Sequence, residues 1–175
     1  IPHKDHILHE GDIVSLDAGL IHEGYHSDAA RTHAVGEVSE EAKKLIQVTK
    51  ECFFEGIKYA KAGNHLFDIS GAIGRYAEER GYGVVRDLCG HGIGTALHEA
   101  PEIPNYEVGR KGVKLRPGMT LAIEPMINIG TYEVDWLDDD WTVVTRDGSL
   151  SAHYENTILI TEGEPRILSL TCDNE

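Results

Sequence analysis

The first apolar segments of the chain predict a β-hairpin. Residues 13–21 and 25–35 are apolar or small with polar interruptions, and Glu23-Gly24 lies between them. Short runs of this kind, separated by a polar residue and a glycine, are typical of two antiparallel strands joined by a tight turn. The chain therefore begins its regular structure with a hairpin over residues 13–35.

After the hairpin, the spacing of apolar residues changes to that of helices. Ser39 supplies a hydroxyl cap ahead of two acidic residues, and apolar residues recur at helical spacing until Gly63. A second helix is predicted over residues 68–80, where apolar side chains share one face and Gly81 follows. Two helices in succession are thus expected after the hairpin.

The second half of the chain is predicted to be mostly strand and loop. Residues 100–118 are rich in proline and glycine and indicate a loop, whereas residues 119–130 indicate a strand. Residues 141–161 predict a second hairpin, turning at Asp147-Gly148. Two helices with many antiparallel strands favour an α+β fold over a doubly wound α/β fold.

Composition adds a limit on partners. A length of 175 residues is typical of a single domain, taken here as residues 1–175. The net charge of −14 repels phosphate backbones and anionic lipid, which disfavours nucleic acid and membrane surfaces as partners. The same field attracts metal ions and the free amino terminus of a peptide. Solubility alone is the simpler explanation of the charge.

The cysteines indicate the compartment. Cys52, Cys89 and Cys172 are an odd number without paired spacing, which favours reduced thiols in a cytoplasmic protein. The chain carries no leader-like segment and no apolar run long enough to span a membrane. It opens on Ile1-Pro2 without an initiator methionine, so we expect that residues precede it in the natural protein.

Two acids in the first hairpin suggest a cation site. With the turn centred on His22-Glu23, Asp17 lies directly opposite Asp28 and on the same face of the sheet. Two ionised carboxylates so close repel each other, so either one is protonated or a cation lies between them. In a different register both acids would face solvent, and the signal would disappear.

Further polar residues stand where a ligand or a cation would explain them. His91 lies between glycines, where the backbone can approach a ligand closely, and His98 follows seven residues later. Glu124 and Glu155 each adjoin an apolar strand, where an unpaired carboxylate is costly to bury. Structural histidines and exposed edge acids are the alternatives at each single position.

Together the five candidates form an oxygen-rich ligand set. It comprises Asp17, Asp28, His91, Glu124 and Glu155. Such a ligand set is typical of a site for two divalent ions and not of a zinc site made of thiolates. Two ions bridged by carboxylates lie about 3.5–4 Å apart and lower the pKa of a shared water. That chemistry is what amide hydrolysis at neutral pH requires.

The motifs resemble those of a known family. "LDAGLIHEGYHSD", "GHGIGTALHEAPEIPNY", "PGMTLAIEPM" and "WTVVTRDGSLSAHYENTI" are similar to segments of the type I methionine aminopeptidases, from Ile1 to about Leu170. The resemblance implies a pita-bread fold, a mostly antiparallel curved sheet with helices on its outer face. It also implies removal of the initiator methionine from nascent proteins and peptides. The native metal remains open among Co, Mn, Fe, Zn and Ni.

The resemblance also assigns roles to single residues. It implies that Asp17 chelates one metal, that Asp28 and Glu155 bridge both, and that His91 and Glu124 complete the second. Glu124 would also carry the proton of the bridging water.

For the substrate, the resemblance implies that His98 contacts the peptide and stabilises the tetrahedral intermediate. Trp141 would lie near the methionine pocket and Leu97 would line it, ordinary core packing being the alternative for Trp141. The neighbourhood of Ser151 binds a monovalent cation in some members.

The start of the chain departs from the family. A His-Gly pair normally precedes Ile-Pro there, so the resemblance implies that the N-terminal part of the fold, with a substrate-contacting histidine, is missing. A complete protein is expected to be a monomer. The alternatives are an Xaa-Pro peptidase of the same fold and a non-catalytic pita-bread module that binds a protein or peptide.

Overall fold

The computed structural model describes residues 3–170, and its first element is the predicted hairpin. Strands β1 (Ile13–His22) and β2 (Tyr25–Ala34) pair antiparallel. Ile1, Pro2 and Cys172 lie outside the described residues. Cys52 and Cys89 form no disulfide within residues 3–170.

The predicted register of this hairpin is wrong by two residues. The turn is Glu23-Gly24, so Asp17 lies opposite Ala30, and Asp28 lies opposite Gly19. Glu23 and Gly24 have φ values of 50° and 85°, the positive pair of a two-residue hairpin turn, and glycine supplies one of them without strain. A slip of two keeps the face of every side chain, so both aspartates still share one face and now lie diagonally across it.

Both predicted helices are present with different ends. Helix α1 (Glu40–Ile57) begins where predicted, and the Ser39 hydroxyl accepts a hydrogen bond from the Ala42 N–H at 3.1 Å. It ends before Gly63 because residues 58–63 form successive tight turns. Helix α2 (Leu66–Glu78) begins two residues earlier than predicted, because the Asp68 carboxylate accepts the His65 N–H at 2.8 Å and caps it.

The remaining strands form three further sheets. Their orders are β10–β7–β3, β12–β11–β6–β4–β5 and β8–β9, with every pair antiparallel. The bounds are β3 (Gly83–Val84), β4 (Gly90–Gly92), β5 (Glu99–Ile103), β6 (Thr120–Ile123), β7 (Met126–Asn128), β8 (Val134–Trp136), β9 (Val143–Thr145), β10 (Ser151–His153), β11 (Asn156–Leu159) and β12 (Arg166–Ile167).

Three predictions for this half need correction. The loop predicted over 100–118 contains most of β5, which pairs with β4. The single strand predicted over 119–130 is two strands in different sheets, β6 and β7. The chain does turn at Asp147-Gly148, but no hairpin forms there, because β9 pairs with β8 and β10 pairs with β7. Tertiary partners outcompete the local pairing that the sequence pattern indicates.

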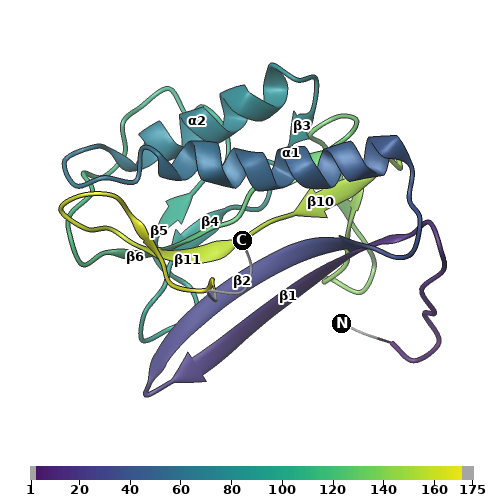
Figure 1. Ribbon diagram of the computed structural model, residues 1–175, viewed down its shortest axis with the longest axis horizontal. Helices are drawn as coiled ribbons and strands as arrows, with labels where there is room; N and C mark the ends of the chain where they lie inside the picture. The colour runs from purple at the N-terminus through teal and green to yellow at the C-terminus, as the bar shows by residue number, and fades with distance from the viewer. Residues whose placement is uncertain (1–2, 171–175) are drawn as a thin grey trace.

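The helices and the first hairpin lie on opposite sides of the central strands. Figure 1 shows α1 and α2 side by side along one side, and β1 and β2 crossing below β11 on the other. The main core is between helices and sheets, with Phe53 and Ile73 from the helices and Leu121, Ile127 and Ile158 from the strands fully buried. Within residues 3–170, no helix has both the length and the apolar character needed to cross a bilayer.

Candidate metal centre

The two glutamates lie where the chain passes from one sheet to another. Glu124 follows β6 of the five-stranded sheet, and after Pro125 the chain enters β7 of the three-stranded sheet. Glu155 lies between β10 and β11, which belong to the same two sheets. These breaks are adjacent, because the Tyr154 N–H donates to the Pro125 carbonyl at 3.2 Å. Interruptions of a ladder re-aim side chains, and here they bring two carboxylates to one place.

The first hairpin docks against the second of these breaks. Glu155 and Ala30 exchange backbone hydrogen bonds, with the Glu155 N–H donating at 2.9 Å. The Asp28 N–H donates to the Thr157 hydroxyl at 2.8 Å, and that hydroxyl donates back to the Asp28 carbonyl at 3.0 Å. Opposite Asp28, a Cβ on Gly19 would lie 3.6 Å from the Asp28 carboxylate. The two hydrogen bonds with Thr157 therefore fix the backbone of Asp28, and its carboxylate is at ordinary contact distance from position 19.

His91 lies on β4 at an irregularity in its pairing with β5. Its Nδ1 is 2.9 Å from the Gly92 carbonyl oxygen, which can only accept, so Nδ1 carries the proton. Nε2 then presents a lone pair, 3.4 Å from Glu124 Oε1 and 4.0 Å from Asp28 Oδ2. A neutral imidazole held by a backbone carbonyl is the usual arrangement of a metal-binding histidine. The pKa of His91 is also lowered, mainly by burial, and this favours the neutral imidazole.

The carboxylates raise one another's pKa values. Burial, followed by the charges of Glu124, Asp28 and Asp17, raises the pKa of Glu155 to about 10. Burial, then Asp17 and Asp28, raises the pKa of Glu124 to about 8. Burial and the Asp28 charge raise the pKa of Asp17 to about 6. Without a counter-ion, therefore, these acids hold protons at a pH where isolated acids are ionised.

The donor set fits divalent cations. Ligand atoms of Asp28, His91 and Glu155 lie within 4.8 Å of one another, and so do those of Asp17, His153 and Glu155. Glu155 is common to both groups, is 1% exposed, and its Oε1 has no hydrogen-bond partner in residues 3–170. Oxygen and imidazole ligands around a shared, unpaired carboxylate suit borderline-hard divalent ions. All five predicted ligands thus lie in one cluster, with Glu124 joined to it through His91.

The predicted substrate residues lie around this cluster. The His98 ring is 4.4 Å from the His91 ring, centroid to centroid, and its side chain is exposed. A cavity of about 430 Å³ is lined by Asp17, Glu124, His98 and Trp141, together with the apolar side chains of Leu88 and Met126. Leu97 does not line that cavity and lies beside Gly19 of β1 instead.

Trp141 is not a core residue. It is 66% exposed at the rim of the cavity, in the turn before β9, and Trp136 beside it is 53% exposed. The alternative of ordinary core packing is therefore wrong. Ser151 is exposed at the start of β10, and its backbone pairs with Asn128.

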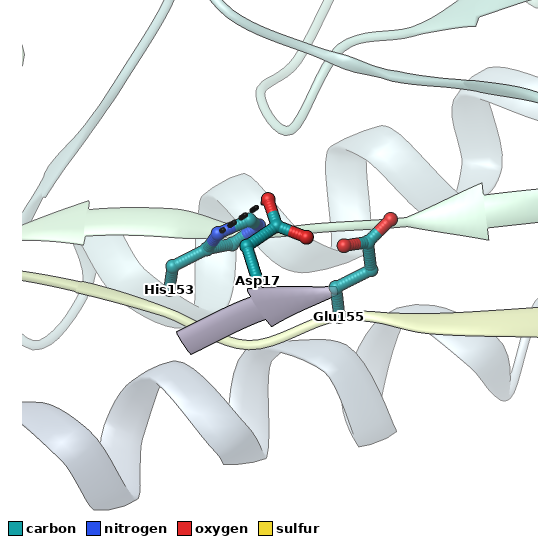
Figure 2. A group of neighbouring side chains, drawn as sticks. All are labelled: Asp17, His153 and Glu155. Carbon is teal, nitrogen blue, oxygen red and sulfur yellow. Dashed lines mark ion pairs between the residues drawn. The ribbon is translucent and has the colours of Figure 1, made fainter. Parts of the chain in front are cut away.

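Three residues near the cluster were not identified from the sequence. His153 lies between Asp17 and Glu124, and Figure 2 shows it beside Asp17 and Glu155. The Arg31 guanidinium donates to the Glu155 carbonyl and, at 2.7 Å, to the Asn156 side chain. Thr157 holds Asp28. The spacing of His153 two residues before Glu155, on alternate positions of an extended segment, was the one sequence signal available.

Comparison with known proteins identifies the same chemistry. The family model described as "Metallopeptidase family M24" matches residues 1–162. A methionine aminopeptidase of Clostridium acetobutylicum is 60% identical over 170 residues, which are 97% of this chain and 68% of that protein. The crystal structure of a methionine aminopeptidase from Thermotoga maritima matches with a TM-score of 0.95 and 48% identity, over 98% of this chain and 69% of that one.

The prolidases, which share the fold, are more distant from this chain. The prolidase from Pyrococcus furiosus matches with a TM-score of 0.75 and 28% identity, over 96% of this chain and 44% of that one. The chain spans about two thirds of the length of the methionine aminopeptidases that it matches. The pita-bread fold expected from the sequence is confirmed by both groups of structures. The chain belongs to metallopeptidase family M24 and, within it, to the methionine aminopeptidases.

Proposed function

We propose that this chain carries the dinuclear metal centre of an enzyme that removes N-terminal methionine from nascent proteins and peptides. The observation that carries the proposal is the 60% identity to a methionine aminopeptidase, in a chain whose five predicted ligands lie in one cluster. Metallopeptidases of this family use divalent metal, and methionine aminopeptidases act on peptide N-termini. The residue roles below are proposals for this chain.

We assign the ligands to two divalent ions. Asp17 would hold one ion, Asp28 and Glu155 would be shared by both, and His91 with Glu124 would hold the second. The central place of Glu155 supports its assignment as a bridge, because its carboxylate belongs to both groups of close ligand atoms. When bound, the ions supply a water of lowered pKa and polarise the scissile carbonyl.

Glu124 is the proton carrier in this proposal. Its side chain is 13% exposed, and in the absence of cations its pKa is raised to about 8, mainly by burial. A carboxylate whose proton affinity is high can accept a proton from the attacking water and return it to the leaving amine. His91 Nε2 lies 3.4 Å from Glu124 Oε1, and a cation held by both residues would lower that proton affinity again.

His98 and the cavity receive the substrate. The exposed His98 imidazole stands beside the ligand cluster, where it can donate to the developing oxyanion of the tetrahedral intermediate. Leu88, Met126 and Trp141 give the cavity apolar walls that suit an unbranched thioether side chain. Leu97, which lies beside Gly19 and outside this cavity, is proposed to line the methionine pocket on the resemblance alone.

The remaining assignments follow from composition and family. We propose that residues 1–175 act as one catalytic domain in the cytoplasm, as part of a monomer, with Co, Mn, Fe, Zn or Ni as the divalent ions. Nucleic acid and membranes are not expected partners, given the net charge of −14. A monovalent cation near Ser151 is a further proposal, based on the resemblance alone.

Peptide cleavage by the purified chain tests the function. After its intact mass is verified, the chain is incubated with Met-Ala-Ser and an Xaa-Pro peptide in the presence of Mn²⁺ or Co²⁺. We expect release of free methionine from the first peptide and no cleavage of the second. The Glu124→Gln variant is the control, because it keeps the size of the side chain and removes its proton transfer.

Other results would support the two alternatives. Cleavage of the Xaa-Pro peptide alone would assign the chain to the prolidase branch. Metal binding without cleavage of either peptide, by a protein whose mass equals the 175 residues, would mean that the catalytic function needs more of the protein than this chain.

A further inference from the structure

His153 is a partly buried imidazole in the candidate metal centre that the predicted ligand set does not use. Its side chain is 14% exposed, and its Nε2 has no hydrogen-bond partner in the described part of the chain. Nε2 is 3.7 Å from Glu124 Oε2, and Nδ1 is 3.9 Å from Asp17 Oδ2. The two ring nitrogens therefore face two carboxylates, which we assigned to different metals.

The backbone holds this ring in place from two sides. The His153 N–H donates to the Thr32 hydroxyl at 2.8 Å, and that hydroxyl donates to the His153 carbonyl at 2.9 Å. On its other side β10 pairs with β7, where His153 lies opposite Met126. Figure 2 shows the ring beside Asp17, with Glu155 projecting from the next part of the same chain segment. The position of the imidazole is thus set by β2 and β7 together.

The two carboxylates differ in how much they gain from a hydrogen bond with the ring. A neutral imidazole has one N–H and one lone pair, so it can donate to only one of them. Glu124 is 13% exposed and Asp17 is 54% exposed, so solvent can satisfy Asp17 but reaches Glu124 poorly. The single N–H therefore stabilises the site most when it is on Nε2 and is directed to Glu124. Such contacts are often long in ligand-free sites and shorten when the site is filled.

We propose that His153 is a positioning residue of the metal centre, whose Nε2–H donates to the Glu124 carboxylate and fixes its orientation. Nδ1 then presents its lone pair on the side of Asp17. The inference rests on the proposed function, because it concerns the orientation of a proposed ligand and proton carrier. Partners of this kind typically change metal affinity by about 10–100-fold when they are removed.

Three variants test the proposal. His153→Gln keeps an N–H donor at nearly the same reach, whereas His153→Asn carries the same amide on a shorter side chain. His33→Asn is the matched control, since His33 is exposed on β2, outside the cluster. Affinity and stoichiometry for Mn²⁺ are measured by calorimetry without substrate, and the visible absorption of bound Co²⁺ reports on its ligands. Thermal unfolding of each variant verifies that it is folded.

We expect His153→Asn to weaken Mn²⁺ binding by about 10-fold or more, and His153→Gln to stay within about threefold of the wild type. The Co²⁺ spectrum of His153→Gln should match that of the wild type. Equal affinities in all variants would overturn the proposal. If His153→Gln lost a metal or changed the Co²⁺ spectrum as strongly as His153→Asn, His153 would be a direct ligand, and the positioning role would be wrong. A wild type that bound no Mn²⁺ at all would instead refute the proposed function.

Discussion

Two regions of this molecule are rich in metal-binding residue types, and only one of them brings its ligand atoms together. The cluster around Glu155 joins ligand atoms within 4.8 Å of one another. The N-terminal segment, with His3, His6 and His9 and the acids Asp5 and Asp12, lines a cavity of about 650 Å³. Among residues 3–170 its side chains form no group of comparably close ligand atoms.

The difference lies in what holds the side chains. His91 and Asp28 project from paired strands, and Glu155 projects from a segment whose backbone is hydrogen-bonded to Ala30. All three residues are at least nine-tenths buried. The His3 and His9 side chains are 71% and 78% exposed in a segment without strands. Residue type alone does not make a site, because an exposed side chain loses conformational entropy when it is ordered around an ion. Paired strands have already restricted that freedom on folding.

Removal of a carboxylate that we assign as a bridge should have the largest effect on metal binding and on the rate. We expect Asp28→Ala or Glu155→Ala to abolish binding of at least one metal, and to lower the rate by more than the roughly 100-fold that outer partners can cost. Calorimetric Mn²⁺ stoichiometry is the measurement, with Glu162→Ala, an exposed acid outside the cluster, as the control. Unchanged stoichiometry in both variants would contradict the assignment of bridges.

His98 tests whether proximity to the centre implies ligation. We expect His98→Ala to retain both metals and to lose about 10²–10³-fold in kcat, the usual cost of one oxyanion donor. Metal content and Met-Ala-Ser turnover are measured on the same sample. Loss of a metal would show that His98 is a ligand and that its assigned role is wrong.

The acid cluster should make the stability of the metal-free protein depend on pH. The pKa values of Glu155 and Glu124 are raised from about 4.5 to about 10 and about 8 in the fold, so above pH 4.5 the folded state binds protons that the unfolded state has lost. Their stabilising contribution is complete below pH 4.5 and disappears as pH rises through 8 and 10.

We therefore expect the melting temperature in EDTA to fall between pH 5 and pH 9, and Mn²⁺ to reverse the fall. Glu155→Gln, which has no charge to lose, should show a shallower slope in scanning calorimetry. A wild-type slope equal to that of the variant would argue against proton uptake by this cluster.

The N-terminal histidines should have the smallest effect. The double variant of His6→Ala and His9→Ala is expected to leave Mn²⁺ stoichiometry and Met-Ala-Ser turnover unchanged, because these side chains are exposed and apart from the cluster. Calorimetry of the variant beside the wild type is sufficient. A lost binding event would show that the segment forms a metal site when an ion is present, and the contrast between the two regions would no longer hold.

Local patterns predicted the elements better than their partners. The turn residues and alternation indicated the first hairpin, and Ser39 indicated the start of α1, because both depend on neighbouring residues. The hairpin predicted at Asp147-Gly148 failed because β10 pairs with β7, about 25 residues earlier in the sequence. The energy that selects such pairings comes from packing against distant strands, which a local pattern does not contain.

The sequence by itself determined the family and predicted the five candidate ligands, because these residues stand in motifs whose order and spacing are specific. It also determined that Asp17 and Asp28 share a face, since a slip of two residues cannot change a face of period two. Only the tertiary structure decided that the chain changes sheets at Glu124 and at Glu155, and that His153 lies between Asp17 and Glu124. The positions of Glu155 and His153 depend on contacts between segments more than a hundred residues apart, such as Ala30 with Glu155, and such contacts exist only in the folded chain.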